Sequence, residues 1–197
     1  MTDDIAEEEP FAPFARWFAL AATKEPLAET IMLATATRGG LPSLRAVLLK
    51  GADENGFVFY TNLESRKAEE LFGNPHAALC MHWKSIARQI RIEGTVALVG
   101  ADEADAYFAT RPRDSQVGAW ASEQSRPLDS RAALEQRFRD FSRQYAERPV
   151  VPRPANWSGF RVSPERIEFW QERPFRLHDR VVFVRDDKTW RKARLFP

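Results

Sequence analysis

The sequence predicts an α+β protein, mainly β, in which peripheral helices pack outside a barrel-like antiparallel sheet. Short alternating apolar segments separated by turn residues fill residues 30–61 and 76–99 and return after residue 157. Helical spacing of apolar residues is strongest at residues 11–22 and 129–145. Strands and helices therefore come in blocks, which argues against a parallel sheet built from alternating βαβ units.

Length and composition predict one domain without a strong electrostatic field. The chain has 197 residues, 44% of them hydrophobic and 29% charged, with a formal net charge of +1. We expect residues 1–10 to form a disordered acidic leader and residues 11–197 to form a single domain. A near-neutral charge makes nucleic-acid binding through the arginines and tryptophans a weak alternative.

The sequence predicts a cytoplasmic protein that does not enter a membrane. The acidic start does not resemble a secretory signal. Arg16 and Lys24 interrupt the most apolar early segment, which is then too short to span a bilayer. The single cysteine, Cys80, cannot form an internal disulfide, and its place in an alternating apolar run predicts that it fills core space.

In the first half of the chain, one helix precedes a series of strands. Phe14, Trp17, Phe18 and Ala21 recur at helical spacing, which predicts an amphipathic helix over residues 11–22. Glycine-containing turns then separate the alternating segments, as expected for antiparallel hairpins. The expected elements are strands at residues 30–37, 43–50 and 57–61, a short helix at 65–72, and strands at 76–83 and 87–99.

The second half begins with helices and ends with strands. Residues 101–121 are helical in pattern, and Pro112 is placed to begin a second helix after the first ends near Arg111. A stronger helix is expected over 129–145, followed by an extended proline-rich connector at 149–154. The expected strands are residues 157–162, 166–171, 180–185 and 189–196.

A first candidate anion site lies at the expected strand-to-helix junction from Thr61 to Lys67. Free backbone N–H groups at a helix start favour phosphate, and Arg66 and Lys67 would add charge-assisted hydrogen bonds. The alternative is a solvated surface helix on which Arg66 and Lys67 pair with Glu69 and Glu70.

Two neighbouring strands carry further polar candidates. Arg45 and Lys50 bracket an apolar run, and on an unbroken strand their five-residue spacing points them to opposite faces. Gln89 alternates with Ile90 and Ile92, which places it on the polar face with Arg91. For Arg45 and Lys50 a strand with charged ends is the commoner case, and for Gln89 an exposed polar face explains the pattern equally well.

A second candidate phosphate site begins in the predicted helix that precedes Pro112. Tyr107 and Arg111 are one helical turn apart, so a phenol and a guanidinium can converge on one anion. Ser115 falls in the first turn of the next helix. The alternative is a helix end that favours cations, with Asp114 paired to a neighbouring arginine.

The run from Ile167 to Arg180 is the most informative segment. If its end is extended, Arg176, His178 and Arg180 share one face, a row suited to a planar anionic ligand because arginine bonds phosphate and histidine exchanges protons near neutral pH. A structural row of ion pairs with Asp179 and Glu172 explains it as well. The three histidines of the chain are too scattered to indicate a metal site.

Taken together, these segments resemble the pyridoxamine/pyridoxine 5′-phosphate oxidase family from about Phe14 to Pro197. The C-terminal run matches that family's signature: an aliphatic residue, Glu-Phe-Trp-Gln at 168–171, four free positions, then Arg-Leu-His-Asp-Arg at 176–180. Several further motifs occur in order, and their co-occurrence outweighs each local alternative. They are Arg45–Lys50, Phe57–Asn62 with Ser65–Lys67, Arg111–Gln116, and Ala119–Ser122 with Gln124 and Ser125.

The resemblance implies an FMN-binding split β-barrel that forms a homodimer, with FMN between the subunits. It assigns the FMN phosphate to Arg66 and Lys67. The residues it implies for FMN as a whole are Arg45, Lys50, Tyr60, Thr61, Arg66, Lys67, Gln89, Gln124, Ser125, Trp170 and Arg180. Those implied for the substrate are Lys50, Tyr107, Arg111, Ser115, Arg176 and His178, the last two also as catalytic residues.

The implied reaction is the FMN-dependent oxidation of pyridoxamine and pyridoxine 5′-phosphates to pyridoxal 5′-phosphate, with O2 as acceptor and release of H2O2. Two features depart from the family pattern: a short acidic leader replaces a basic, tyrosine-bearing arm, and residues 27–31 differ from the family's approach to the first strand. A related split-barrel flavoprotein with another substrate and a non-catalytic FMN or pyridoxal phosphate binder are the alternatives.

Overall fold

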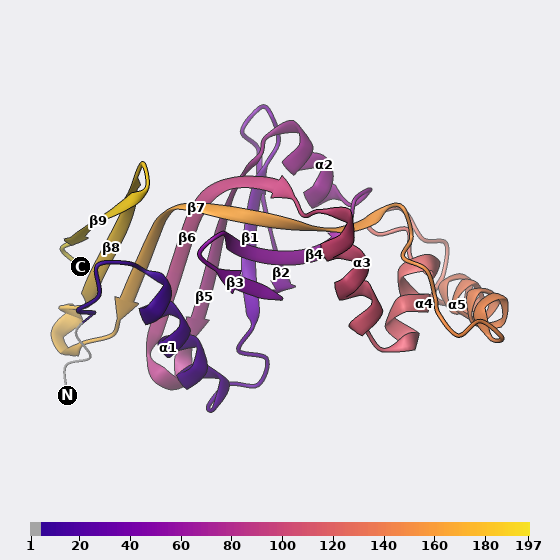
Figure 1. Cartoon of the computed structure of the whole chain (residues 1–197), viewed down its shortest axis with the longest axis horizontal. Helices are drawn as coiled ribbons and strands as arrows, with labels where there is room; N and C mark the ends of the chain where they lie inside the picture. Colours follow the sequence, from indigo (N-terminus) through magenta and orange to yellow (C-terminus); the bar gives the residue numbers. More distant parts are fainter. Residues whose placement is uncertain (1–4) are drawn as a thin grey trace.

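A computed structural model describes residues 5–197 and consists of one nine-stranded antiparallel sheet with peripheral helices (Figure 1). The strands follow the order β2-β1-β5-β6-β7-β4-β3, and β8 pairs with β7 and with β9. This arrangement confirms the predicted mainly β class. Within the described residues, no helix is long and apolar enough to cross a membrane.

The strands occur close to their predicted positions, because alternating burial and turn residues mark them in the sequence. Strand β3 is an addition, a short strand that pairs with the start of β4. The bounds are β1 (Thr30–Ala36), β2 (Pro42–Leu48), β3 (Gly51–Asp53), β4 (Gly56–Asn62), β5 (His76–Trp83), β6 (Arg88–Leu98), β7 (Trp157–Gln171), β8 (Asp179–Asp186) and β9 (Thr189–Arg194).

Strand β7 combines the two strands that were predicted at residues 157–162 and 166–171. It pairs with β6 along its length, with β4 at its start and with β8 at its end. The register shifts between Glu93 and Gly94, where β7 carries an extra residue. A Cβ on Gly94 would lie 2.0 Å from the Ser163 carbonyl oxygen, so only glycine fits this bulge. The bulge keeps one strand continuous where the hydrophobic pattern suggested two.

The helices lie at two ends of the sheet. In Figure 1, α1 lies beside the left half of the sheet, whereas α3, α4 and α5 extend from its right end. The helix predicted over residues 11–22 is confirmed at both bounds. The bounds are α1 (Phe11–Ala22), α2 (Arg66–Gly73), α3 (Ala101–Thr110), α4 (Arg113–Ala121) and α5 (Arg131–Tyr145), with one-turn 3₁₀ segments η1 (Lys84–Ile86) and η2 (Pro174–Arg176).

Clusters of buried hydrophobic residues hold these layers together, and two of them are large. The main core buries one face of α1, including Phe14 and Trp17, against the sheet. A second core beneath α3, α4 and α5 contains Phe108, Tyr145 and Trp157. Because Trp157 begins β7, the second core fixes the helices to the end of that strand.

The end of the C-terminal run corrects one prediction. Residues 174–178 are not extended: they include the 3₁₀ turn η2, and Phe175 and Arg176 have φ of 61° and 62°. The reason is topological, because β7 and β8 are antiparallel neighbours paired through Gln171 and Asp179, so the chain must reverse between them. Strict alternation therefore cannot place Arg176, His178 and Arg180 on one face.

Cys80 corrects a second prediction. In β5 the neighbours Leu79 and Met81 face the core, at 1% and 0% exposure, whereas Cys80 lies half-buried on the opposite face. Alternation along the strand explains the error: Cys80 shares its face with His76 and His82, whereas Leu79 and Met81 belong to the fully apolar face.

The segment that precedes α1 contacts the domain in its described part. Ile5 is 4% exposed and joins the main core, and the Glu7 side chain pairs with Arg16. Lys192 of β9 donates to the Glu7 carbonyl oxygen at 3.0 Å. Residues 1–4 of the predicted leader lie outside the described residues.

Candidate active site

A hollow of about 1040 Å³ gathers most of the predicted site residues. It lies among β2, β4, the start of α2, the α3–α4 corner and the loop after α4. Such a volume is at the upper end of what ligand pockets usually have. The predicted residues that line it are Arg45, Lys50, Tyr60, Thr61, Arg66, Lys67, Tyr107, Arg111, Ser115, Gln124 and Ser125.

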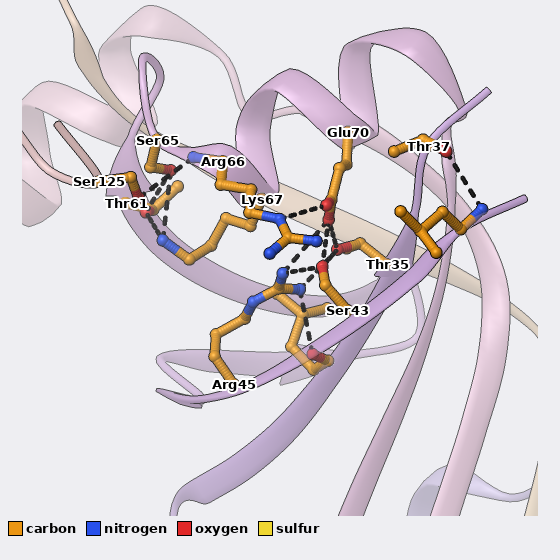
Figure 2. Close-up of polar contacts among 12 residues, drawn as sticks. Thr35, Thr37, Ser43, Arg45, Thr61, Ser65, Arg66, Lys67, Glu70 and Ser125 are labelled. Carbon is orange, nitrogen blue, oxygen red and sulfur yellow. Dashed lines mark hydrogen bonds and ion pairs between the residues drawn. The ribbon is translucent and has the colours of Figure 1, made fainter. Parts of the chain in front are cut away.

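One end of the hollow is built around the Lys67 ammonium group. Its Nζ donates to Thr61 Oγ1 at 3.0 Å, to Ser65 Oγ at 3.2 Å and to Gln124 Oε1 at 3.0 Å. Ser125 accepts the backbone N–H of Arg66 at 3.3 Å. The first turn of α2 and the loop after α4 therefore meet at this cation (Figure 2).

Burial, together with the neighbouring positive charge of Arg45, lowers the pKa of Lys67 to about 8. Three neutral oxygens solvate the ammonium group, but none supplies a negative charge. A dianionic phosphate in the hollow would supply it.

The alternative for α2, a surface helix on which both Arg66 and Lys67 pair with glutamates, holds for Arg66 but not for Lys67. Arg66 does pair with Glu70 one turn later, Nε to Oε1 at 2.9 Å. Lys67, however, is only 7% exposed and turns inward, away from the solvated face that the alternative required. The structure thus separates two adjacent cations, one partly exposed and one buried.

Arg45 and Lys50 both line the hollow, although on an unbroken strand their five-residue spacing would point them to opposite faces. The prediction assumed one unbroken strand, but β2 ends at Leu48 and the Lys50 backbone N–H bonds the Val58 carbonyl oxygen across to β4. The two residues therefore do not belong to one continuous strand, and strict alternation does not relate their side chains.

The other end of the hollow is aromatic and carries a second cation. The rings of Tyr60 and Tyr107 stack at 3.9 Å, those of Tyr60 and Trp157 at 5.3 Å, and the Arg111 guanidinium lies 4.7 Å from the Trp157 ring centre. Burial raises the pKa of Tyr60 to about 12, raises that of Tyr107 and lowers that of Arg111.

Arg111 carries a buried atom that needs a partner. Its Nη1 has no hydrogen-bond partner within the described residues. Leaving a buried charged donor unpaired is costly, so such a group in a hollow indicates a site for an anion. Ser115, in the first turn of α4, lines the same part of the hollow.

The remaining predicted residues form a second cluster at the β6–β7–β8 end of the sheet. Trp170 pairs in register with Gln89 and with Arg180, and the rings of Trp170 and His178 lie 4.6 Å apart. Arg176 is exposed on the η2 turn, and the structure records no ion pair or hydrogen bond for its side chain among the described residues.

The ion pairs of this cluster differ from those predicted as the alternative. Asp179 pairs with Arg173, Nε to Oδ2 at 2.5 Å, instead of with the arginine row. Arg180 donates to the buried Glu168 at 2.8 Å. Ion pairing therefore accounts for Arg180 and Arg173 but leaves Arg176 unexplained.

Strand β7 separates the two groups within one chain. Trp157 lines the hollow and Trp170 belongs to the second cluster, 13 residues further along β7. At about 3.3 Å per residue the strand path between them is about 43 Å. Figure 1 shows the two ends of β7 on opposite sides of the molecule.

Two residues, Trp157 in the hollow and Glu70 behind the arginines that line it, were not singled out as part of the site from the sequence. Trp157 contributes the base of the aromatic stack, and nothing in its local pattern distinguishes it from a core tryptophan. Glu70 appeared only as a surface partner of the α2 cations, and its spacing from Arg66 was the available signal.

Two family models together match most of the chain. Residues 21–145 match the model described as pyridoxamine 5′-phosphate oxidase, and residues 157–197 match the pyridoxine 5′-phosphate oxidase C-terminal dimerisation region. The pyridoxine/pyridoxamine 5′-phosphate oxidase of Gluconobacter oxydans is 60% identical over 190 residues, 96% of this chain and 94% of that protein. Its namesake in Rhodospirillum rubrum is 58% identical over 199 residues, 98% of each.

Solved structures agree on the fold. PhzG from Burkholderia lata, in complex with tetrahydrophenazine-1-carboxylic acid, superposes with a TM-score of 0.91 at 31% identity, covering 98% of this chain and 95% of that one. A pyridoxamine 5′-phosphate oxidase-related, FMN-binding protein from Nostoc punctiforme has a TM-score of 0.78, covers 97% of this chain and all of that one, and at 18% identity supports the fold alone.

Proposed function

The chain belongs to the pyridoxine/pyridoxamine 5′-phosphate oxidase family, and we propose that it oxidises both phosphates to pyridoxal 5′-phosphate with FMN as cofactor and O2 as acceptor. One observation carries the proposal furthest: a single hollow holds two separate sets of cations. Arg66 and Lys67 lie at one end and Arg111 at the other. A phosphorylated cofactor beside a phosphorylated substrate requires such a pair of sites.

The donors at the α2 end fit the phosphate of FMN. Arg66 and Lys67 supply charge, Thr61 and Ser65 supply hydroxyls, and Ser125 and Gln124 close the site from the loop after α4. FMN, when bound, accepts a hydride from the substrate and passes two electrons to O2, giving H2O2. The chain's part is to hold the two ligands at the required distance and angle.

The aromatic end fits the substrate phosphate. Arg111 Nη1 lacks a partner there among the described residues, Ser115 adds a hydroxyl, and Lys50 and Tyr107 also line the hollow. This set argues against a related flavoprotein whose substrate has no phosphate, since it would leave Arg111 buried without a partner.

The second cluster completes the site from another subunit. The C-terminal dimerisation-region match, residues 157–197, contains Trp170, Arg176, His178 and Arg180. The chain forms a homodimer of this family, and we infer that FMN lies between the hollow of one subunit and this cluster of its partner. The length of β7 supports that placement, because one chain holds the two groups at opposite ends of a strand.

The hydrogen bond at His178 favours a donor role. Its Nδ1 accepts the Arg173 backbone N–H at 3.2 Å, which places the proton of the neutral ring on Nε2. His178 would then donate to the substrate instead of removing its proton. Arg176, exposed and unpaired among the described residues, is free to lie over the substrate ring.

The test is to purify the protein, record its absorption spectrum and follow aldehyde and peroxide formation with pyridoxamine 5′-phosphate. We expect a flavin spectrum and turnover, and far lower activity with unphosphorylated pyridoxamine. A colourless protein that stays inactive with added FMN would overturn the proposal, and a yellow protein without turnover would favour the non-catalytic binder. A cytoplasmic location remains a proposal that rests on the single cysteine.

The matched variants are Arg176→Ala and Arg173→Ala, two arginines of the same connection. Arg176→Ala should lower turnover with FMN still bound, because it faces the substrate in the proposed site. Arg173→Ala removes a partly buried ion pair with Asp179 and should affect thermal stability more than turnover. Loss of FMN in Arg176→Ala would mean that this residue belongs to the cofactor.

A further inference from the structure

Glu70 is a buried carboxylate that joins helix α2 to the β1–β2 hairpin. It is 6% exposed. Its Oε2 accepts hydrogen bonds from the hydroxyls of Thr35 and Ser43 and lies 3.2 Å from Arg45 Nη2, and its Oε1 accepts from Arg66 Nε at 2.9 Å. Figure 2 shows all four side chains pointing toward this one carboxylate.

The two arginines are held differently. Arg45 turns both terminal nitrogens onto the protein, Nη1 toward the Leu33 carbonyl oxygen at 3.2 Å and Nη2 toward Ser43 and Glu70. Arg66 uses only its Nε, and within residues 5–197 neither of its Nη groups has a recorded partner. Glu70 thus fixes the Arg66 guanidinium by one edge and leaves the other edge for a ligand in the hollow.

The charges around Glu70 match a phosphate monoester. Burial alone would raise the pKa of Glu70, but hydrogen bonds from Ser43, Thr35, Arg66 and Arg45 lower it to about 2, so the carboxylate is ionised at neutral pH. Arg45, Arg66 and Lys67 carry three positive charges and Glu70 one negative charge, which leaves a formal +2. A phosphate monoester carries about −1.5 to −2 at pH 7.

We propose that Glu70 is a positioning residue for the phosphate of the cofactor: it holds the Arg66 guanidinium in place and offsets the mutual repulsion of the cations before the phosphate binds. The inference rests on the proposed function, since it takes the phosphate at this end to be that of FMN. It assigns a role to a residue that does not itself touch the ligand.

The test compares FMN with riboflavin, which lacks the phosphate, on full-length Glu70→Gln protein. Dissociation constants are measured by quenching of flavin fluorescence. We expect FMN to bind about tenfold to hundredfold more weakly, the usual effect of weakened charge-assisted hydrogen bonds, with riboflavin unchanged. Glu69→Gln is the matched control, because Glu69 lies on the same helix but pairs with exposed Arg126, and it should leave both constants unchanged.

The ratio of the two constants separates positioning from mere structural support. An unchanged ratio in Glu70→Gln would overturn the inference, whether both flavins bind equally more weakly or neither constant changes. Partial recovery of FMN binding in Glu70→Asp, which restores the charge, would support it.

If Glu70→Gln does not fold, Ser43→Ala is tested in its place, because it removes one hydrogen bond to Glu70 and one to Arg45. FMN should then bind about threefold more weakly with riboflavin unchanged, because Glu70 and Arg45 each lose one of several partners. An unchanged ratio would overturn the inference. A wild-type chain that binds neither flavin would overturn the proposed function itself, whereas tight wild-type FMN binding with no change in the ratio overturns only the role of Glu70.

Discussion

The hollow and the β6–β8 cluster share one kind of ion pair in different surroundings. In each, a buried glutamate holds an arginine: Glu70 holds Arg66 in the hollow, and Glu168 holds Arg180 at 2.8 Å in the cluster. The hollow is enclosed by β2, β4, α2 and α4 of one chain, whereas the cluster ends in an exposed turn where Arg176 has positive φ. In the proposed dimer, one half of the site is built within one chain, and the other half, which is open in that chain, would be covered by another subunit.

The strongest test of this comparison mixes two inactive variants. Arg111→Ala disables the hollow and Arg176→Ala the cluster, and each alone should lose about 10²-fold in turnover through mispositioned substrate. Subunits exchanged between the two variants should recover about a quarter of wild-type activity, because half of the dimers of a two-fold assembly are mixed and each has one intact site. Activity is followed by peroxide release. No recovery after verified subunit exchange would contradict shared sites.

Gly159→Ala should disturb the hollow and spare the cluster. A Cβ at this position would lie 2.8 Å from Tyr60 Cε1, and the ring cannot move freely because it is stacked on Tyr107 and Trp157. We expect a loss of about 1–3 kcal/mol in unfolding free energy, as for other overpacked cores, and a raised KM for pyridoxamine 5′-phosphate.

Chemical denaturation and steady-state kinetics would check the Gly159→Ala prediction. Gly73→Ala is the control, since a Cβ there meets nothing within 4 Å. Wild-type stability and KM in Gly159→Ala would show that the aromatic stack does not shape the substrate site.

The buried ammonium group of Lys67 should make FMN binding sensitive to alkaline pH. With a pKa of about 8 in the free protein, Lys67 loses its proton above that pH. The affinity for FMN should then fall by up to about tenfold for each further pH unit. The stability of the free protein should change in the opposite direction. Between about pH 8 and 10.5 Lys67 is protonated in the unfolded chain but not in the folded one, so the contribution of Lys67 to the unfolding free energy rises over that window.

Flavin titrations at several pH values would test the prediction for Lys67. Lys67→Arg, which stays charged, should remove the slope, and riboflavin should show little slope in either protein. FMN affinity that is constant across the window would mean that Lys67 does not contact the phosphate.

The smallest expected effect is that of Glu168→Gln. Glu168 Oε2 lies 3.5 Å from Arg166 and 3.7 Å from Arg91, so Arg180 is one of several cations that it holds. We expect FMN and riboflavin to bind more weakly by the same factor, about threefold or about 0.7 kcal/mol, because in the proposed site this cluster would face the flavin ring and not the phosphate. The same fluorescence titration measures both. Weaker binding of FMN alone would contradict the prediction, because Glu168 would then affect the phosphate as Glu70 does.

Much of the fold was predictable because local patterns encode it. The bounds of α1 follow from the spacing of Phe14 and Trp17, and β5 from its alternation. The errors arose where distant segments decide the outcome: the bulge at Gly94 joined two predicted strands, and the pairing of Gln171 with Asp179 forced a turn through Arg176. Neither effect has a signal within a short window of sequence.

The sequence by itself determined most of the helices and strands and, through its ordered motifs, the family to which the chain belongs. Tertiary structure decided that Arg45 and Lys50 share one hollow, that Glu70 lies between two arginines, and that β7 separates the hollow from the signature run. The physical reason is that periodicity reports how each segment is buried, whereas the convergence of side chains depends on register, bulges and changes of partner strand. Those depend on contacts between segments that are far apart in the chain.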